Sequence, residues 1–177
     1  MHIALLRGIN VGGKNRLPMK DLTEFFIAAG CTGVSTYIQS GNVIFNAPKA
    51  ILKKLPTAIQ GQIAGRFGFE APVIIRSSEH LGQTIRDNPF LQAGGPEKAL
   101  HVMFLADLPD PAAVASLDFN RSPGDRFHVR GQDVYLHLVN GAHSKLTNAY
   151  FDSKLRTRST VRNWATVLKL LELSSRL

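Results

Sequence analysis

Residues 34–46 have the sequence VSTYIQSGNVIFN, in which two short runs of β-branched, aromatic and polar residues flank a Ser-Gly pair. Such runs predict strands over residues 34–39 and 42–46, because these side chains pack well on a pleated surface. Ser40-Gly41 predicts a two-residue hairpin turn in which Gly41 takes a positive φ at little steric cost. We therefore expect a β-hairpin at the centre of the first half of the chain.

A strand-like and a helix-like segment flank this hairpin on each side. Upstream, His2–Arg7 predicts a strand, and Pro18–Ala29 predicts a helix that begins at a proline and ends before a glycine. Downstream, Lys49–Gly65 predicts a helix and Pro72–Arg76 a strand. The resulting order, β-α-β-β-α-β, is that of the ferredoxin-like unit.

The second half repeats this order less regularly. A predicted helix over Ser78–Arg86 and a Gly- and Pro-rich loop over Asn88–Pro96 separate the halves. The elements predicted after them are a strand at Leu100–Leu105, a helix at Pro111–Leu117, strands at Asp125–Arg130 and Asp133–Leu138, and helices over residues 145–152 and 159–173. We expect an α+β protein of two fused ferredoxin-like (βαββαβ) subdomains, residues 1–88 with the linking helix and 97–177. The second is expected to be degenerate, without a clear final strand, and to end in a C-terminal helix.

Composition indicates a globular chain without a membrane segment. The 177 residues are 44% hydrophobic and include a single cysteine, Cys31, which excludes an internal disulfide. No apolar run approaches the roughly 20 residues that span a bilayer, and the N-terminus lacks the features of a secretory leader. The expected location is cytoplasmic, with no membrane partner.

The formal net charge of +8 is concentrated at the two ends of the sequence. Residues 1–20 contribute +4 and residues 145–177 contribute +5, whereas the intervening part contributes −1. If the two ends met in space, they would form one basic field able to attract phosphate. The alternative is a solvated surface that aids solubility only.

A glycine-rich segment, RGINVGGKN at residues 7–15, follows the first predicted strand. It matches the nucleotide-binding pattern G-x-x-x-x-G-K-[ST] except at Asn15, where that pattern has a hydroxyl for Mg²⁺. The helix should also follow the lysine at once, whereas residues 16–18 intervene. Two interpretations stay open: a generic phosphate-binding loop, and a demanding turn whose glycines serve geometry alone.

Two further clusters follow from the predicted sheets. The first and third strands of a ferredoxin-like sheet are neighbours, so we expect a polar cluster of Arg7, Asn10, Gln39, Ser40 and Asn42; alternatively, Gln39 and Asn42 only satisfy the turn backbone. In the second half, a Gly131-Gln132 turn places Arg126, His128, Arg130, Tyr135 and His137 on one face of the hairpin. That face is either a surface for single-stranded nucleic acid or an ordinary solvent face.

Catalytic and metal-binding signatures are missing from the sequence. It contains no G-x-S-x-G, H-E-x-x-H or C-x-x-C motif, and only His128 and His137 offer a speculative metal pair. We expect no cofactor and no metal site, and the sequence leans against an enzyme.

Three blocks of the sequence resemble a known family. They are ALLRGINVGGK at residues 4–14, YIQSGNV at residues 37–43, and Arg162-Asn163-Trp164 with Thr166-Val167. They are similar to the signature blocks of a bacterial family catalogued as domain of unknown function 1697. The resemblance covers essentially the whole chain and implies an α+β fold with two ferredoxin-like subdomains. It implies no activity.

The leading hypothesis is binding of a phosphate-bearing ligand, a nucleic acid or nucleotide, through the basic glycine-rich loop. The expected site residues are Arg7, Gly8, Asn10, Gly12, Gly13, Lys14, Gln39, Ser40, Asn42, Arg162 and Asn163. Two alternatives are an enzyme acting on a small phosphorylated or acidic substrate, and a protein–protein interaction module. The oligomeric state stays open.

Overall fold

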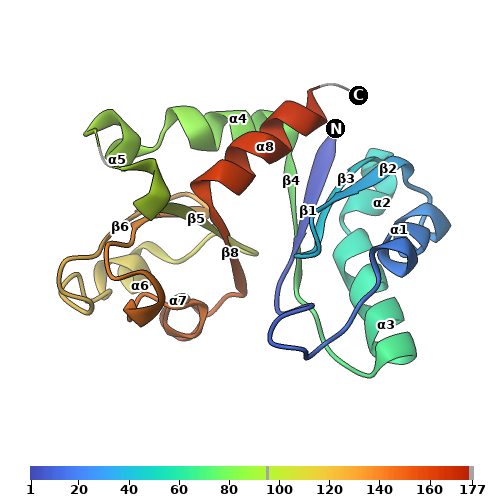
Figure 1. Ribbon diagram of the computed structural model, residues 1–177, viewed down its shortest axis with the longest axis horizontal. Coiled ribbons are helices and arrows are strands. Elements are labelled where there is room, and N and C mark those ends of the chain that lie inside the picture. Colours follow the sequence, from blue (N-terminus) through green and yellow to red (C-terminus); the bar gives the residue numbers. More distant parts are fainter. Residues whose placement is uncertain (95, 176–177) are drawn as a thin grey trace. The chain divides into compact units, whose positions relative to one another are not determined.

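A computed structural model describes residues 1–94 and 96–175 (Figure 1). The chain divides into two compact units: unit 1 comprises residues 1–82 with 169–177, and unit 2 comprises residues 83–168. The subdomain limits expected from sequence, 1–88 and 97–177, stay a prediction of domain organisation. Among the helices of the described residues, none has the length and hydropathy needed to cross a bilayer.

Unit 1 contains one complete ferredoxin-like set of elements. They are β1 (His2–Leu6), α1 (Met19–Ala28), β2 (Thr32–Tyr37), β3 (Asn42–Asn46), α2 (Lys49–Leu52), α3 (Leu55–Phe67) and β4 (Val73–Ser77). The antiparallel sheet has the order β2-β3-β1-β4, and α1, α2 and α3 cover one of its faces (Figure 1). This confirms the fold predicted for the first half, although the expected helix over residues 49–65 is two helices.

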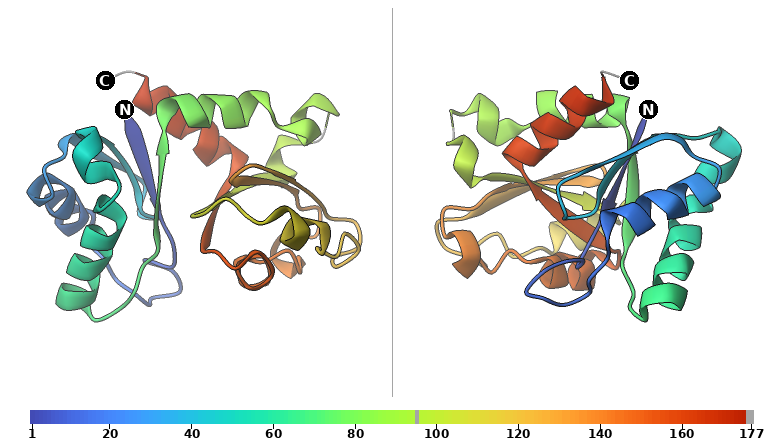
Figure 2. Two further views of the ribbon diagram at one scale, coloured as in Figure 1. Left: turned by 180° about the vertical axis from the view of Figure 1, so that it is seen from behind. Right: turned by 45° about the vertical axis from the view of Figure 1, so that its right-hand side comes forward.

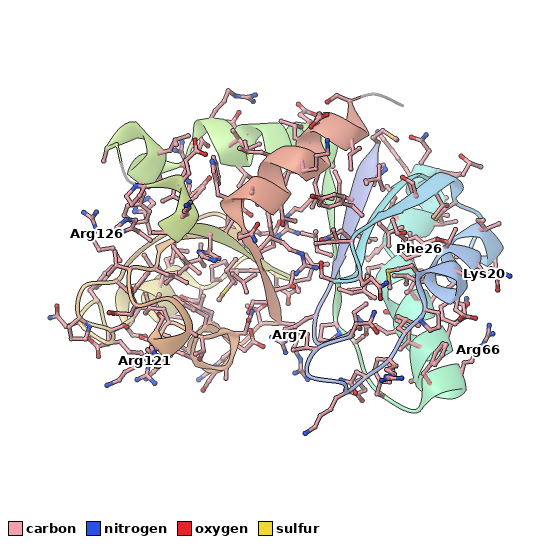
Figure 3. All side chains as sticks on the ribbon, viewed as in Figure 1. Arg7, Lys20, Phe26, Arg66, Arg121 and Arg126 are labelled. Carbon is pink, nitrogen blue, oxygen red and sulfur yellow. The ribbon has the colours of Figure 1, made fainter. Side chains whose placement is uncertain are left out.

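The core of unit 1 is centred on β1. This strand pairs with β3 on one side and β4 on the other, and its residues Ile3 to Leu6 are fully buried. Ala4 and Leu6 pack with Leu22 and Phe26 of α1, the latter labelled in Figure 3. Cys31 belongs to the same core, and burial raises the pKa of its thiol. Because β1 lies between β3 and β4, backbone hydrogen bonds hold this strand on both of its edges.

The first hairpin has a longer loop than predicted. Tyr37 pairs with Asn42, so residues 38–41 form a four-residue loop and the expected two-residue Ser40-Gly41 turn is wrong. Gly41 has φ +75°, and a Cβ there would lie 2.6 Å from the Leu6 Cβ. The Leu6 N–H donates to the Gly41 carbonyl at 2.8 Å. Only glycine fits this close crossing of the loop over the end of β1.

Unit 2 contains a second set of elements with the same topology. They are α5 (Pro89–Gln92), a 3₁₀ turn η1 (Glu97–Ala99), β5 (Leu100–Leu105), α6 (Pro111–Ala115), β6 (Arg126–Arg130), β7 (Asp133–His137), a 3₁₀ turn η2 (Gly141–His143), α7 (Asn148–Leu155) and β8 (Ser159–Asn163). The antiparallel sheet has the order β6-β7-β5-β8. Two helices, α4 (Ser78–Arg86) and α8 (Trp164–Ser174), continue from one unit into the other along the chain.

The final strand, β8, corrects the sequence prediction for the second half. A helix was expected over residues 159–173, but Ser159–Asn163 is a strand that pairs with β5, and the helix begins at Trp164. The β-branched pair Thr160 and Val161 favours a strand. Pairing with β8 also satisfies the free edge of the buried strand β5. The second subdomain is therefore complete rather than degenerate.

The polar face of the second hairpin is covered along β7 only, whereas Arg126, His128 and Arg130 on β6 are exposed, as the solvent-face interpretation expects. The register of β6 and β7 matches the predicted Gly131-Gln132 turn and pairs His128 with Tyr135. However, Tyr135 is 1% exposed and His137 is also buried. The ring of Phe90 in α5 lies 5.9 Å from that of His137. Figure 2 shows α5 on the side of this sheet opposite to α6 and α7.

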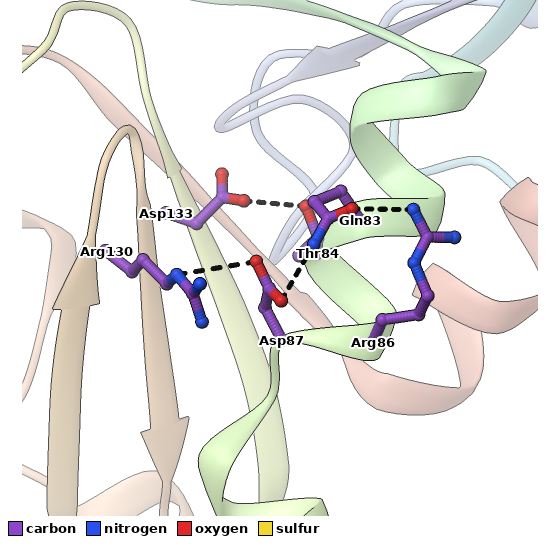
Figure 4. A network of polar contacts seen from close by, with 6 residues as sticks. All are labelled: Gln83, Thr84, Arg86, Asp87, Arg130 and Asp133. Atoms are coloured by element: carbon purple, nitrogen blue, oxygen red, sulfur yellow. Dashed lines mark hydrogen bonds and ion pairs between the residues drawn. The ribbon is translucent and has the colours of Figure 1, made fainter.

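A polar network ties the end of α4 to this hairpin (Figure 4). The Thr84 hydroxyl donates to the Asp133 carboxylate at 2.6 Å, and Asp87 forms an ion pair with Arg130 at 3.4 Å. Burial, and then the negative charge of Asp133, raise the pKa of Tyr135. The part of the face that lies on β7 is therefore built into the protein interior.

The close crossing at Gly41 makes a testable prediction. We expect Gly41→Ala to lower the free energy of unfolding by about 3 kcal/mol, from the left-handed φ and the overpacking together. Gly68→Ala is the matched control, because Gly68 also has φ +75° but has open space around its Cβ position. We expect about 1 kcal/mol for that variant. Equal losses in urea denaturation would contradict the close approach.

Candidate functional site

An open hollow of about 700 Å³ lies on unit 1 where α1 begins. Its lining residues are Asn10, Gly13, Arg16, Leu17, Pro18, Met19, Lys20 and Gln39. It therefore brings together three residues predicted from the sequence, namely Asn10, Gly13 and Gln39, with five that were not predicted.

The glycine-rich segment is a tight turn rather than a nucleotide-hydrolase loop. Gly12 and Gly13 have φ of 58° and 75° and occupy the centre of a turn closed by the Lys14 N–H, which donates to the Val11 carbonyl at 3.0 Å. Positive φ at both central residues is the geometry of a type I′ hairpin turn. Within the described residues, the Gly12 and Gly13 N–H groups contact no acceptor. They remain available to a ligand.

The side chain of Asn10 connects three segments of this site. Its amide nitrogen donates to the carbonyl of Leu17 and to that of Gln39, each at 2.9 Å. Its amide oxygen accepts from the Leu17 N–H at 2.8 Å. Asn10 also has φ 53°, a conformation that asparagine tolerates better than most residues. One neutral amide thus joins the turn, the segment before α1 and the loop between β2 and β3.

The loop between β2 and β3 is strained beside this contact. Ile38 has φ 49°, which is a genuine outlier for a β-branched residue, and 51% of it is exposed. Burial therefore does not explain the positive φ of Ile38. The hydrogen bond from the Asn10 side chain to the carbonyl of Gln39, the residue after Ile38, helps to hold this conformation. Strain of this kind persists only where neighbouring contacts over-determine the backbone, and it concentrates at functional sites.

The hollow is electropositive. Arg16 and Lys20 are exposed and make no ion pair with any residue of the described segments. Asp21, the acidic residue of the first turn of α1, forms an ion pair with Arg66 at 2.6 Å. Lys20 and Arg66 are labelled in Figure 3. Pro18 precedes α1 without a side-chain cap, so the first N–H groups of the helix add a partial positive charge.

The other predicted residues of unit 1 do not line the hollow; they are Arg7, Gly8, Gly12, Lys14, Ser40 and Asn42. The Gly8 carbonyl accepts from the Asn15 side chain at 2.8 Å. Asn42 is fully buried and donates to the Ser40 hydroxyl at 2.9 Å and to the Tyr37 carbonyl at 3.1 Å. The Arg7 N–H donates to the Pro72 carbonyl, and Arg7 is labelled in Figure 3. Lys14 is exposed at the end of the tight turn.

Arg162 and Asn163, the two remaining predicted residues, belong to unit 2. Burial lowers the pKa of the Arg162 guanidinium to about 10, and this side chain donates to the Thr160 hydroxyl at 2.8 Å. The Asn163 side chain accepts from the Thr166 N–H at 2.8 Å, as helix N-caps do. Neither residue lines the hollow on unit 1.

Sequence reasoning missed Arg16, Leu17, Pro18, Met19 and Lys20. A signal was present, because cations lie two residues before and two residues after a helix-starting proline.

The lining of the hollow contains no carboxylate, histidine or cysteine. In the described segments, no three His, Cys, Asp or Glu residues are grouped to hold a metal ion. The charged side chains among the lining residues are Arg16 and Lys20, and both are cations.

The Asn10 bridge can be tested by substitution. We expect Asn10→Ala to cost about 3 kcal/mol of unfolding free energy, because it breaks three hydrogen bonds and disfavours the left-handed φ. The Leu17 amide should then exchange much faster with deuterium. Asn15→Ala is the control, since Asn15 also has a left-handed φ of 51°, but its side chain donates to the Gly8 carbonyl within its own loop. Equal losses in the two variants would contradict the bridging role.

Comparison with known proteins supports the fold and assigns a family. A solved structure of a conserved bacterial protein from Streptococcus pneumoniae is 21% identical, with a TM-score of 0.74, and the match covers 98% of this chain and 97% of that one. Comparison with curated proteins finds no matching sequence. The family model described as "Protein of unknown function (DUF1697)" matches residues 1–135. The chain therefore belongs to the DUF1697 family.

Proposed function

We propose that this protein binds a phosphate-bearing ligand, a nucleotide or a nucleic acid, in the hollow at the start of α1. The observation that carries the proposal is the meeting of two unpaired cations, Arg16 and Lys20, in a hollow of about 700 Å³. That volume lies within the range of small-molecule sites. Exposed cations without a carboxylate partner favour an anionic ligand.

Backbone donors support the same ligand chemistry. Gly13 lines the hollow, and its N–H donates to no acceptor within the described residues. The uncapped start of α1 lies on the other side, at Met19. Phosphate oxygens accept well from such backbone groups, and the helix dipole favours negative charge there. Asn10 and Gln39 add neutral amides that can orient the rest of the ligand.

Binding is better supported than catalysis. The alternative of an enzyme needs a group able to transfer a proton, and the lining of the hollow offers no carboxylate, histidine or cysteine for that role. The alternative of an interaction module receives no specific support from the hollow. We therefore place the phosphate-binding proposal first.

Calorimetric titration of the full chain with inorganic pyrophosphate and with a nucleoside triphosphate tests the proposal. We expect binding that weakens steeply with salt. Arg16→Gln and Lys20→Gln should each weaken it about tenfold, because a hydrogen bond to a charged group contributes about 1.5–3 kcal/mol.

Lys53→Gln provides the matched control for this titration. Lys53 is exposed on unit 1, at the end of α2, and it does not line the hollow. We expect this variant to bind as the unaltered chain does. A folded protein that binds neither pyrophosphate nor the nucleotide at low salt would refute the proposal, and so would an equal loss in all three variants.

A further inference from the structure

Unit 2 contains a continuous series of aromatic contacts that reaches the surface. Phe119 lies parallel to Phe127, at 4.9 Å between ring centroids and 6° between planes. Phe127 contacts Phe151 edge to face at 5.3 Å, and Phe151 contacts Tyr150 at 5.1 Å. Three of these rings are buried, but 64% of Phe119 is exposed. One face of its ring is therefore supported by the core, and the other is open.

Arg121 is held in a fixed orientation at the other end of this series. Its guanidinium carbon lies 4.3 Å from the centroid of the Tyr150 ring, and its Nε donates to the Lys145 carbonyl at 3.2 Å. The Tyr150 hydroxyl accepts from the Asp118 N–H at 2.8 Å. Tyr150 thus anchors both ends of the short segment that carries Phe119.

The terminal nitrogens of Arg121 face outward from this arrangement. In residues 1–94 and 96–175, neither contacts an acceptor, and Figure 3 labels Arg121 on the periphery of unit 2. A planar guanidinium that is already oriented matches the oxygen atoms of a phosphate, and little side-chain entropy remains to be lost. Arg121 is therefore prepared to bind a phosphate group.

A second open hollow lies beside Arg121. It has a volume of about 390 Å³ and is lined by Arg121, Thr147, Ala149, Tyr150, Ser153 and Lys154. Lys145 and Lys154 are exposed, and they form no ion pair with the described residues. The nearby carboxylate of Asp118 accepts a hydrogen bond from the Asn120 N–H at 2.9 Å. The hollow therefore combines hydroxyl groups with unpaired positive charge.

We propose that this surface, formed by Phe119, Arg121 and the hollow on α7, binds single-stranded nucleic acid. A base would stack on the open face of Phe119, and the neighbouring phosphates would contact Arg121 and Lys154. Stacking on an aromatic ring beside a basic groove is the common mode of binding to single strands without sequence preference. This surface shares no residue with the hollow on unit 1.

Fluorescence anisotropy of the full chain with short labelled thymidine or uridine oligonucleotides tests this proposal. We expect Phe119→Ala to weaken binding about tenfold, and Phe119→Trp to retain it. Arg121→Ala should weaken binding and lower the slope of log affinity against log salt by about one. Arg121→Lys should keep the slope but lose part of the affinity, because lysine lacks the planar fork.

Two variants on other parts of unit 2 serve as matched controls. Leu108 is 72% exposed, so Leu108→Ala removes an equally exposed apolar side chain. Arg158→Ala removes the same charge as Arg121→Ala, at an exposed position of unit 2 that does not line the hollow. We expect both control variants to bind as the unaltered chain does.

Several results would overturn the proposal. One is a folded protein that binds no oligonucleotide at low salt, and another is equal affinity for an abasic oligonucleotide of the same length. A loss in Leu108→Ala equal to that in Phe119→Ala would also refute it. If the double variant of Arg16 and Lys20 to glutamine abolished binding while Phe119→Ala did not, the oligonucleotide would be assigned to the hollow of unit 1. Sedimentation that showed Phe119→Ala turning a dimer into a monomer would identify a subunit contact instead.

Discussion

The burial of the two central strands, β1 and β5, constrains the rest of each unit. A backbone buried in this way must find partners for its N–H and C=O groups within the protein, so each strand needs a neighbour on both sides. For β1 these neighbours are β3 and β4, and for β5 they are β7 and β8. The resulting strand order also determines which loops lie next to one another at the ends of the strands. In unit 1 it brings the loop of residues 38–41 against Leu6, and thus against the segment that carries Asn10.

In the candidate site of unit 1, one residue holds the backbone segments together and two other residues carry the charge. Asn10 supplies support, because its amide is fully used in contacts with Leu17 and Gln39 and carries no charge. Arg16 and Lys20 supply charge, and neither is used in an ion pair within the described residues. The Asn10 contacts order the backbone of this site, so that ordering entropy on binding a ligand would be lost mainly by the exposed Arg16 and Lys20 side chains.

The excess positive charge of the sequence is found in both units. Arg16 and Lys20 border the hollow on unit 1, and Lys154 borders the hollow on unit 2. The two surfaces differ in what accompanies the charge. On unit 1 it is accompanied by backbone donors and amides, which suit a phosphate group, whereas on unit 2 it lies beside aromatic rings, which also suit a base. The physical distinction between the two proposals is therefore the contribution of stacking.

Local patterns predicted most of the elements, but contacts distant in sequence determined the rest. The alternation of apolar residues and the Pro and Gly positions predicted β1, α1, β3, α4 and β5 closely, because these signals act within a few residues. The helical spacing of apolar residues around Val161 hid β8, which forms because β5 needs an edge partner. The contact that covers His137 also comes from α5, a helix that the sequence did not indicate. The same holds for the hollow. Glycines and cations marked its neighbourhood, and the expected strand order placed Asn10 near Gln39, but only the tertiary structure brought Leu17 to Asn10 and left Arg16 and Lys20 without acidic partners among the described residues. Such contacts leave no periodic trace in a chain.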